Sequence, residues 1–237
     1  MLYLIGLGLN EKGISLEGIE VLKKCKKVYL ENYTVDFPYS SEKLEKIIDK
    51  KIIPADRNFV EDMKVLLDES KKENVALLVY GSPLTATTHI SLIEEARKKN
   101  IGCEIIYGAS IFDAIAETGL QIYKFGKITS MPKWGKNYEP TSFLKIVKEN
   151  QKINSHSLIL IDIGLDLKDA ISELEESAKK EKLKFENIVV CSRFGTKDSK
   201  IFYGGVNRLK KIEIKKPYCM IIPGKLHFIE EEVLKNF

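Results

Sequence analysis

The sequence contains no apolar run that approaches the roughly 20 residues needed to cross a bilayer. Its N-terminal stretch, residues 1–5 (MLYLI), is apolar, but no basic segment precedes it. Gly6 and Gly8 interrupt this stretch, and polar residues follow at positions 10–12. This pattern is not that of a signal peptide. We therefore expect a cytoplasmic protein without a membrane partner.

Closely spaced metal-binding pairs are also absent. The four cysteines are Cys25, Cys103, Cys191 and Cys219, and none forms a CxxC pair. A structural zinc site needs such spacing, so we expect no metal centre. All four lie in apolar or amphipathic surroundings, and we interpret them as small buried thiols of a reducing compartment.

The excess of one charge sign is small. The chain has 38 Lys and Arg against 34 Asp and Glu, and its pI is about 8.6. This mildly basic character favours an encounter with an acidic partner but does not by itself indicate nucleic-acid binding. An apolar content of 44% is too high for a disordered chain. A length of 237 residues allows one large or two small domains.

The first half of the chain alternates short apolar runs with amphipathic stretches, which predicts an α/β fold with a mostly parallel sheet. Strands are predicted at residues 2–5, 28–30, 52–53, 75–80 and 103–107, with Pro54 ending the third. Helices are predicted at residues 15–25, 41–48, 59–72 and 89–99.

The second half has a different rhythm. Residues 119–140 hold three glycines and two prolines, and predict a domain crossover followed by an irregular loop. Helices are predicted after it at residues 141–149, 168–180 and 226–234, and strands at 158–163, 188–191, 201–203, 212–214 and 218–222. The later strands follow one another without helices, which predicts a mixed sheet.

The first candidate motif is the turn Gly6-Leu7-Gly8 after the first strand. A dinucleotide-binding fingerprint requires a third glycine three residues later, and that position is Glu11. A nicotinamide cofactor is therefore disfavoured. Either the glycines only let the chain leave the sheet, or the turn leaves room for a ligand at the carboxyl edge of the strands, where open α/β sheets bind ligands.

A hydroxyl-rich loop, residues 81–89 (GSPLTATTH), joins the predicted strand 75–80 to a helix. Its serine and threonines form a polar rim that suits the carboxylate or amino end of a small ligand. We expect Thr87 or Thr88 to cap the helix. His89 is interpreted as a structural side chain at the helix start and not as a catalyst.

A second strand-to-helix turn follows at residues 107–111 (YGASI). Its small residues would let the backbone approach a ligand, and Ser110 is a natural N-cap for a helix over 111–117. A purely structural interpretation would suffice for either loop alone. A ligand-binding role for the two loops is favoured because both should open on the same edge of the sheet.

Six strings run in order from the first strand almost to the last helix: LIGLGL at 4–9, GSPLTATTH at 81–89, YGASI at 107–111, GLQIYKFGK at 119–127, PTS at 140–142 and IPGKLH at 222–227. Together they resemble the diphthine synthases of the tetrapyrrole methylase superfamily, also called class III methyltransferases. The TATTH and PGKLH strings carry most of the resemblance.

The resemblance implies two α/β domains, residues 1–113 and 114–237, with S-adenosyl-L-methionine bound in the cleft between them, and a homodimer. It implies methylation of the amino group of a modified histidine in translation elongation factor 2 to a trimethylammonium, within diphthamide biosynthesis. The product of the cofactor would be S-adenosyl-L-homocysteine. Cofactor contacts are implied at matching positions: Leu9, Ser82, Thr85, Ser110, Ile111, Ile161, Phe194 and Tyr218.

Two of these positions depart from the pattern of the family. Ser82 stands where the loop usually has aspartate, and Tyr218 stands where relatives often have histidine. Both departures put the cofactor contact in question. No general base is identified from the sequence, so the catalytic residues are unknown. There are three alternatives: an enzyme that methylates a tetrapyrrole or corrin macrocycle, a binding module that has lost activity, and a nucleic-acid-binding protein.

Overall fold

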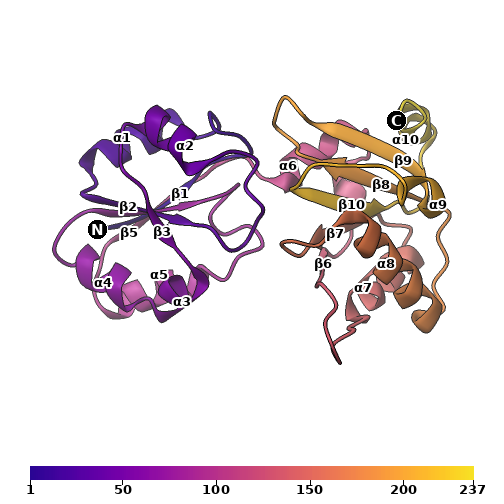
Figure 1. Ribbon diagram of the computed structural model, residues 1–237, viewed down its shortest axis with the longest axis horizontal. Helices are drawn as coiled ribbons and strands as arrows, with labels where there is room; N and C mark the ends of the chain where they lie inside the picture. The colour runs from indigo at the N-terminus through magenta and orange to yellow at the C-terminus, as the bar shows by residue number, and fades with distance from the viewer. The chain divides into compact units, whose positions relative to one another are not determined.

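A computed structural model describes all 237 residues of the chain. The backbone divides into two compact units, Met1–Asp113 and Ala114–Phe237. Each unit is a five-stranded sheet with helices packed against it (Figure 1). The α/β prediction of one parallel and one mixed sheet is confirmed.

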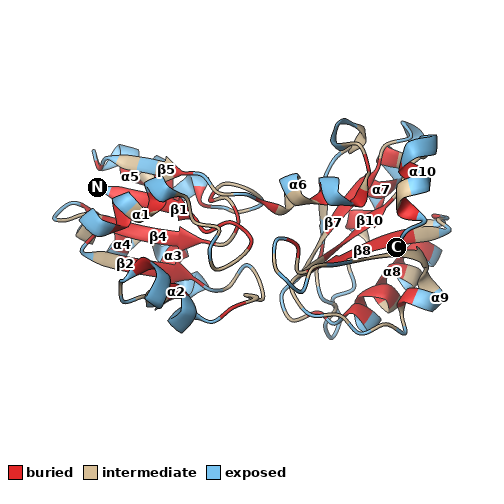
Figure 2. Ribbon diagram, turned by 90° about the horizontal axis from the view of Figure 1, so that it is seen from above, coloured by how far each residue is buried: buried red, intermediate tan, exposed pale blue.

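The first unit is built on a fully parallel sheet of order β3-β2-β4-β1-β5. Its strands are β1 (Leu2–Gly6), β2 (Lys27–Glu31), β3 (Ile53–Ala55), β4 (Val75–Val79) and β5 (Cys103–Ile106). Every residue of β1 and β4 is buried, because helices cover both faces of these central strands. Figure 2 shows the same central strands in red.

The helices of the first unit form two cores, one on each face of the sheet. Helices α1 (Leu16–Lys24) and α2 (Ser41–Ile48) cover one face through Leu22 and Leu44. The other face is covered through a separate core by α3 (Arg57–Asp62), α4 (Lys64–Ser70) and α5 (Ile90–Lys98). Figure 1 shows these two groups on opposite sides of the sheet. The short helix α6 (Ile111–Ala114) follows β5.

Two sequence predictions for the first unit are wrong in detail. The helix expected over 59–72 is broken into α3 and α4 at Met63, whose φ of 58° is left-handed, a region that few non-glycine residues adopt. The hydrophobic periodicity of the sequence continues across the break, so the sequence pattern alone predicts one continuous helix. Pro54 lies inside β3 and does not end it. Because β3 is an edge strand, the missing N–H of proline costs no ladder hydrogen bond there.

The second unit is built on a mixed sheet of order β6-β7-β10-β8-β9, in which only β6 and β7 run parallel. Its strands are β6 (Thr129–Met131), β7 (Ser157–Ile161), β8 (Asn187–Ser192), β9 (Lys200–Gly205) and β10 (Tyr218–Ile222). Helices α7 (Ser142–Lys152) and α8 (Leu167–Glu181) pack on one face over Val147, Leu174 and Met220. The remaining helices are α9 (Val206–Leu209), α10 (Phe228–Leu234) and the 3₁₀ turns η1 (Ile115–Thr118) and η2 (Ile122–Lys124).

Two further predictions fail in the second unit. The segment 119–140 contains the short strand β6, whose polar sequence Thr-Ser-Met gives no strand signal. It is held in place by Asn150, which donates to the carbonyl of Lys127 and accepts from its amide. The strand expected at 212–214 does not form. Ile212 and Ile214 pack against the core as irregular chain, so their alternation reports burial and not a sheet.

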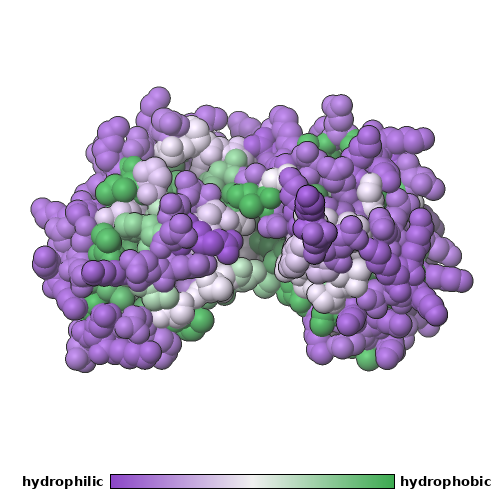
Figure 3. Space-filling view, turned by 60° about the horizontal axis from the view of Figure 1, so that its bottom comes forward, coloured by the Kyte–Doolittle hydropathy of each residue, from purple (hydrophilic) through white to green (hydrophobic).

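All four cysteines are free thiols; Cys25, Cys191 and Cys219 are buried and Cys103 is partly buried. None of the helices combines the length and the apolar character that crossing a bilayer requires. On the face drawn in Figure 3, hydrophilic residues predominate and apolar residues gather in separate groups.

Candidate functional site

Three turns meet at the carboxyl edge of the parallel sheet, after β1, β4 and β5. The turns after β1 and β4 are joined directly: the amide of Gly8 donates to the carbonyl of Gly81 at 3.1 Å, and the amide of Gly81 donates to that of Gly8 at 2.9 Å. Both glycines have positive φ, of 65° and 72°. The predicted convergence of two ligand loops at one edge is therefore present, with the first glycine turn as a third member.

The turns approach one another more closely than side chains would allow. A Cβ atom on Gly6 would lie 2.7 Å from the amide nitrogen of Gly108 and 2.7 Å from the carbonyl oxygen of Gly81. A Cβ atom on Gly108 would lie 2.6 Å from the same carbonyl. These contacts are with backbone atoms that cannot move aside, so the glycines are required for packing and not only for turning.

The threonine loop is folded on itself at the rim of this edge. The amide of Thr85 donates to the carbonyl of Ser82 at 3.0 Å, and the hydroxyl of Thr87 donates to the carbonyl of Pro83 at 2.7 Å. The side chains of Ser82 and Thr85 are partly buried and form no hydrogen bond within the protein. Their hydroxyls are therefore available to a polar ligand.

The predicted threonine cap is wrong. The N-cap of α5 is His89, and neither Thr87 nor Thr88 caps the helix with its hydroxyl. Thr87 is drawn back to Pro83, and only the backbone carbonyl of Thr88 contacts the first turn, where Ser91 donates to it.

His89 anchors the end of the loop. It is 2% exposed; its Nδ1 lies 3.0 Å from the carbonyl of Pro83, and its Nε2 lies 3.0 Å from Oε2 of Glu31. Glu31 ends β2, is fully buried, and accepts from the hydroxyl of Thr34. Burial alone would lower the pKa of His89, but the carboxylate of Glu31 and the carbonyl of Pro83 outweigh it and raise the pKa. His89 stands at the start of α5 with buried contacts, as the structural interpretation predicts, while its partner Glu31 was not expected from the sequence.

The second loop is fixed by a reciprocal cap. The amide of Ser110 donates to Oδ2 of Asp113 at 2.7 Å, and its hydroxyl accepts from the amide of Phe112 at 3.1 Å. Ser110 therefore caps α6 as predicted, although this helix ends at Ala114 and continues only as the 3₁₀ turn η1. Ile111, the first residue of α6, is partly buried.

Leu9 completes the candidates of the first unit. It directly follows Gly8, is 7% exposed, and its carbonyl accepts from the hydroxyl of Tyr80 at 3.0 Å. Five of the eight predicted cofactor positions thus lie on three turns at one sheet edge: Leu9, Ser82, Thr85, Ser110 and Ile111.

The other three candidates lie at one end of the mixed sheet. Ile161 ends β7 and Tyr218 begins β10, and the register pairs their neighbours Leu160 and Cys219. Tyr218 also pairs with Ser192 at the end of β8, and Phe194 follows two residues later with 3% exposure. The hydroxyl of Tyr218 donates to the carbonyl of Leu165 at 3.1 Å.

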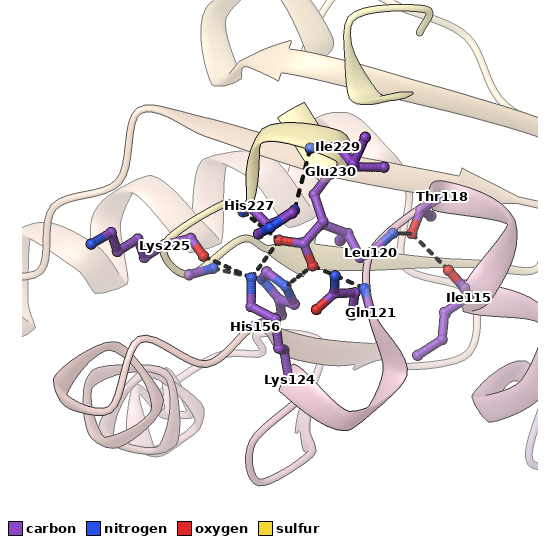
Figure 4. A network of polar contacts seen from close by, with 11 residues as sticks. Ile115, Thr118, Leu120, Gln121, Lys124, His156, Lys225, His227, Ile229 and Glu230 are labelled. Atoms are coloured by element: carbon purple, nitrogen blue, oxygen red, sulfur yellow. Dashed lines mark hydrogen bonds and ion pairs between the residues drawn. The ribbon is translucent and has the colours of Figure 1, made fainter. Parts of the chain in front are cut away.

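A buried polar network at the opposite end of the mixed sheet was not expected from the sequence (Figure 4). Its centre is Glu230 of α10, which is fully buried. The carboxylate accepts from the amide of His227 at 2.7 Å and from the amide of Gln121 at 3.0 Å, and it pairs with the ammonium of Lys124. The network ties the GLQIYKFGK and PGKLH strings together.

The second histidine of the network, His156, is neutral. Its Nδ1 accepts from the amide of Gly224 at 2.9 Å, so the ring proton must be on Nε2, which then donates to Oε1 of Glu230 at 3.0 Å. Burial is the main cause that lowers the pKa of His156. For Glu230, burial alone would raise the pKa, but the amide of His227, the ammonium of Lys124 and the amide of Gln121 lower it to about 2.

The family model described as Tetrapyrrole (Corrin/Porphyrin) Methylases matches residues 1–210. The sequence is also 39% identical to diphthine synthase of Methanococcus maripaludis strain S2, over 99% of this chain and 98% of that protein. The chain belongs to the tetrapyrrole methylase family, among its diphthine synthases.

Other diphthine synthases agree with this assignment. The diphthine synthase of Methanocaldococcus jannaschii is 39% identical over 99% of this chain and 98% of that protein. The diphthine methyl ester synthase of Schizosaccharomyces pombe is 36% identical over the whole chain and 94% of that protein. A crystal structure of a diphthine synthase superposes with a TM-score of 0.91 at 32% identity, covering 100% of this chain and 95% of that one. As a diphthine synthase homologue, the chain is a methyltransferase.

The Glu31–His89 pair gives a prediction for stability. The variant His89→Ala leaves a buried carboxylate without its partner, so we expect it to lower the free energy of unfolding by about 3–5 kcal/mol. Because the folded pKa of His89 is raised, the wild-type contribution is complete below pH 6.5 and lost as the pH rises through the folded value. Denaturant unfolding across this pH range measures both effects. Equal pH profiles for wild type and His89→Ala would contradict the assignment.

The depressed pKa of Glu230 gives a prediction of opposite sign. A carboxyl whose pKa falls from 4.5 to about 2 on folding contributes stability above pH 4.5 that is lost as the pH falls through about 2. We expect Glu230→Gln to lower the free energy of unfolding by roughly 3 kcal/mol at neutral pH. This deficit should shrink in acid. The neighbouring Glu231→Gln is the control, since Glu231 is exposed; a similar loss in both variants would refute the role of the network.

Proposed function

We propose that this chain is an S-adenosyl-L-methionine-dependent N-methyltransferase of diphthamide biosynthesis. It methylates the amino group of a modified histidine on translation elongation factor 2 to a trimethylammonium. The observation that carries this proposal is similarity to diphthine synthases over 99% of the chain. Methylation of a tetrapyrrole or corrin macrocycle is the alternative, and it rests only on the wider family name.

We propose that the eight positions predicted from the sequence contact the cofactor. In the first unit, the hydroxyls of Ser82 and Thr85 offer hydrogen bonds, and the glycine-lined turns let a ligand approach the backbone. Ser82 can serve here without a carboxylate, since its hydroxyl forms no hydrogen bond within the protein. The hydroxyl and the amide of Ser110 already take part in the cap of α6, so we keep Ser110 in the set without assigning it a hydrogen bond to the ligand.

In the second unit, Ile161, Phe194 and Tyr218 offer mainly apolar contacts, and the Tyr218 hydroxyl is directed to the carbonyl of Leu165. A set of hydroxyls, backbone groups and apolar side chains suits a ligand that combines a polar amino-acid end with a flat aromatic ring. These residues therefore fit S-adenosyl-L-methionine.

Methyl transfer from this cofactor does not require acidic or basic side chains as nucleophiles. The sulfonium of S-adenosyl-L-methionine supplies an activated methyl group, so transfer to an amine is a displacement that needs no protein nucleophile. The protein must orient the amine, exclude water and receive its uncharged form. Rigid turns meet the first two needs. We assign no general base, because both buried histidines are committed to structural contacts.

Assembly and location stay predictions. The homodimer follows from the resemblance to diphthine synthases, and the cytoplasm is where elongation factor 2 works. Sedimentation of the purified chain would establish whether it forms a dimer.

Mass spectrometry of the protein substrate tests the activity. Elongation factor 2 that carries the unmethylated histidine derivative is incubated with the purified chain and S-adenosyl-L-methionine. We expect three methyl additions on that one residue, stable to mild alkali, as a trimethylammonium requires. A further addition that alkali removes would indicate a methyl ester, the product for which the S. pombe relative is named. Label in a corrin macrocycle and none in the protein would favour the alternative.

Calorimetry with S-adenosyl-L-homocysteine tests the proposed cofactor rim. Thr85→Val keeps the shape of the side chain and removes one hydroxyl, so we expect the affinity to fall about threefold to tenfold. Thr88→Val is the matched control from the same loop, because its exposed side chain is not among the proposed contacts. If both variants bind as wild type does, Thr85 is not a cofactor residue. If wild type itself shows no saturable heat, the chain is a binding module without this cofactor.

A further inference from the structure

A hollow of about 330 Å³ lies in the second unit, formed by three segments that are distant in the sequence. The segments are the end of η2, the turn after α7 and the PGKLH string before α10. The lining residues are Lys124, Ile153, Asn154, Ser155, Lys225, Leu226 and His227. None of them belongs to the proposed cofactor set, so the hollow has no role in the function derived above.

The walls of the hollow are fixed in place. Lys124 donates to the carbonyl of Lys225 at 2.9 Å, and its ammonium pairs with the buried carboxylate of Glu230. Gly224 packs directly on the opposite turn: a Cβ atom there would lie 2.5 Å from the carbonyl oxygen of Asn154 and 2.6 Å from that of Ser155. The surface is therefore preorganised, which lowers the entropic cost of binding a partner.

The rim of the hollow is cationic. The side chain of Lys225 is exposed, forms no ion pair, and extends away from Glu230 in Figure 4. Lys152, which ends α7 beside the hollow, is also exposed and forms no ion pair. The charge of Lys124, in contrast, is neutralised by Glu230. Lys225 thus brings an ammonium without an ion pair to the hollow, and Lys152 adds positive charge directly before the lining residue Ile153 while it also attracts Glu149.

Large apolar side chains stand on the same segments. Ile153, which lines the hollow, is 68% exposed, and Phe228, next to His227, is 69% exposed. Tyr123, next to Lys124, is 84% exposed. Such residues on adjoining segments, beside unpaired lysines, are typical of a protein-binding surface and not of a small-anion site.

Within the second unit, the hollow and the proposed cofactor residues Ile161 and Tyr218 lie at opposite ends of the mixed sheet. The register pairs Ser157 with Ile222 beside the hollow, and Leu160 with Cys219 next to Ile161 and Tyr218. The length of β10, five residues, separates the two ends by about 15 Å. A protein partner is large enough to contact both ends at once.

We propose that this hollow and its apolar rim are a docking site for the protein substrate, separate from the methyl-transfer site. The inference rests on the proposed function. The surface accepts a part of elongation factor 2 that presents carboxylates next to apolar side chains. Lys225 and Lys152 attract the carboxylates, and Ile153, Phe228 and Tyr123 contact the apolar groups. Docking there orients the modified histidine before methylation.

A second copy of the chain fits this surface less well. A two-fold interface uses the same patch on both copies, so it would bring Lys225 and Lys152 from both into one interface. No uncompensated carboxylate of the hollow would balance them, because Glu230 is already paired and buried. Charge complementarity therefore favours an acidic partner over self-association.

Binding and kinetics of Lys225→Glu and Tyr123→Ser test the proposal. Elongation factor 2 is titrated against each variant in the presence of S-adenosyl-L-homocysteine, and the KM for the protein substrate is measured separately. We expect Kd and KM to rise by about tenfold or more in each variant, with kcat and the affinity for S-adenosyl-L-homocysteine unchanged. The wild-type affinity should also fall as salt is added.

Matched controls come from other exposed positions. Lys211→Glu reverses an exposed charge after α9, and Leu16→Ser removes an apolar side chain that is 85% exposed in the first unit. Both should bind as wild type does. If wild type methylates elongation factor 2 and the hollow variants match it in Kd and KM, the docking site is refuted and the proposed function stands.

Two other outcomes overturn the proposal in different ways. If Tyr123→Ser lowers the mass in sedimentation while Kd is unchanged, the surface belongs to a dimer. If wild type neither binds nor methylates elongation factor 2, the proposed function fails together with the docking site.

Discussion

The close approach of three backbone turns at one edge of the parallel sheet is the constraint on which the first unit depends. Gly6, Gly81 and Gly108 lie so near one another that a Cβ atom on Gly6 or Gly108 would meet main-chain atoms at 2.6–2.7 Å. Because these turns follow different strands, the contact fixes the ends of β1, β4 and β5 relative to one another. The positions of the side chains on these turns, including the hydroxyls of Ser82 and Thr85, depend on this contact.

Buried charge supports the loops in both units, and it does so in the same manner. Glu31 with His89, and Glu230 with Lys124 and His156, each place a carboxylate out of contact with water. Burying such groups costs free energy that only good hydrogen bonding offsets. Glu31 links the end of β2 to the threonine loop through His89, and Glu230 links α10 to Gln121, Lys124 and His156. The networks therefore specify loop positions, which a purely apolar core would leave less defined.

Much of the fold follows from the sequence because hydrophobic runs report burial directly. The runs at β1 and β4 identify central strands, and the helix-free spacing in the second half indicates a mixed sheet. The errors have physical causes. Met63 adopts a left-handed φ that local patterns do not encode, β6 is a polar edge strand, and Ile212 and Ile214 are partly buried without a strand partner.

The candidate site was predictable in part for a similar reason. Glycines and hydroxyls after a strand are visible as local signals, whereas Glu31 and Glu230 act through partners that only folding brings near. A reaction with a self-activated methyl donor requires positioning more than it requires acid–base groups. Titratable residues are then expected to support the loops and not to contact the reacting groups. His89, buried at the end of the threonine loop, and His156, buried directly before β7, have protonation states that are set by stabilising contacts. In such an enzyme, buried acids and bases hold loops in fixed positions. Their location therefore identifies the loops whose rigidity the reaction requires.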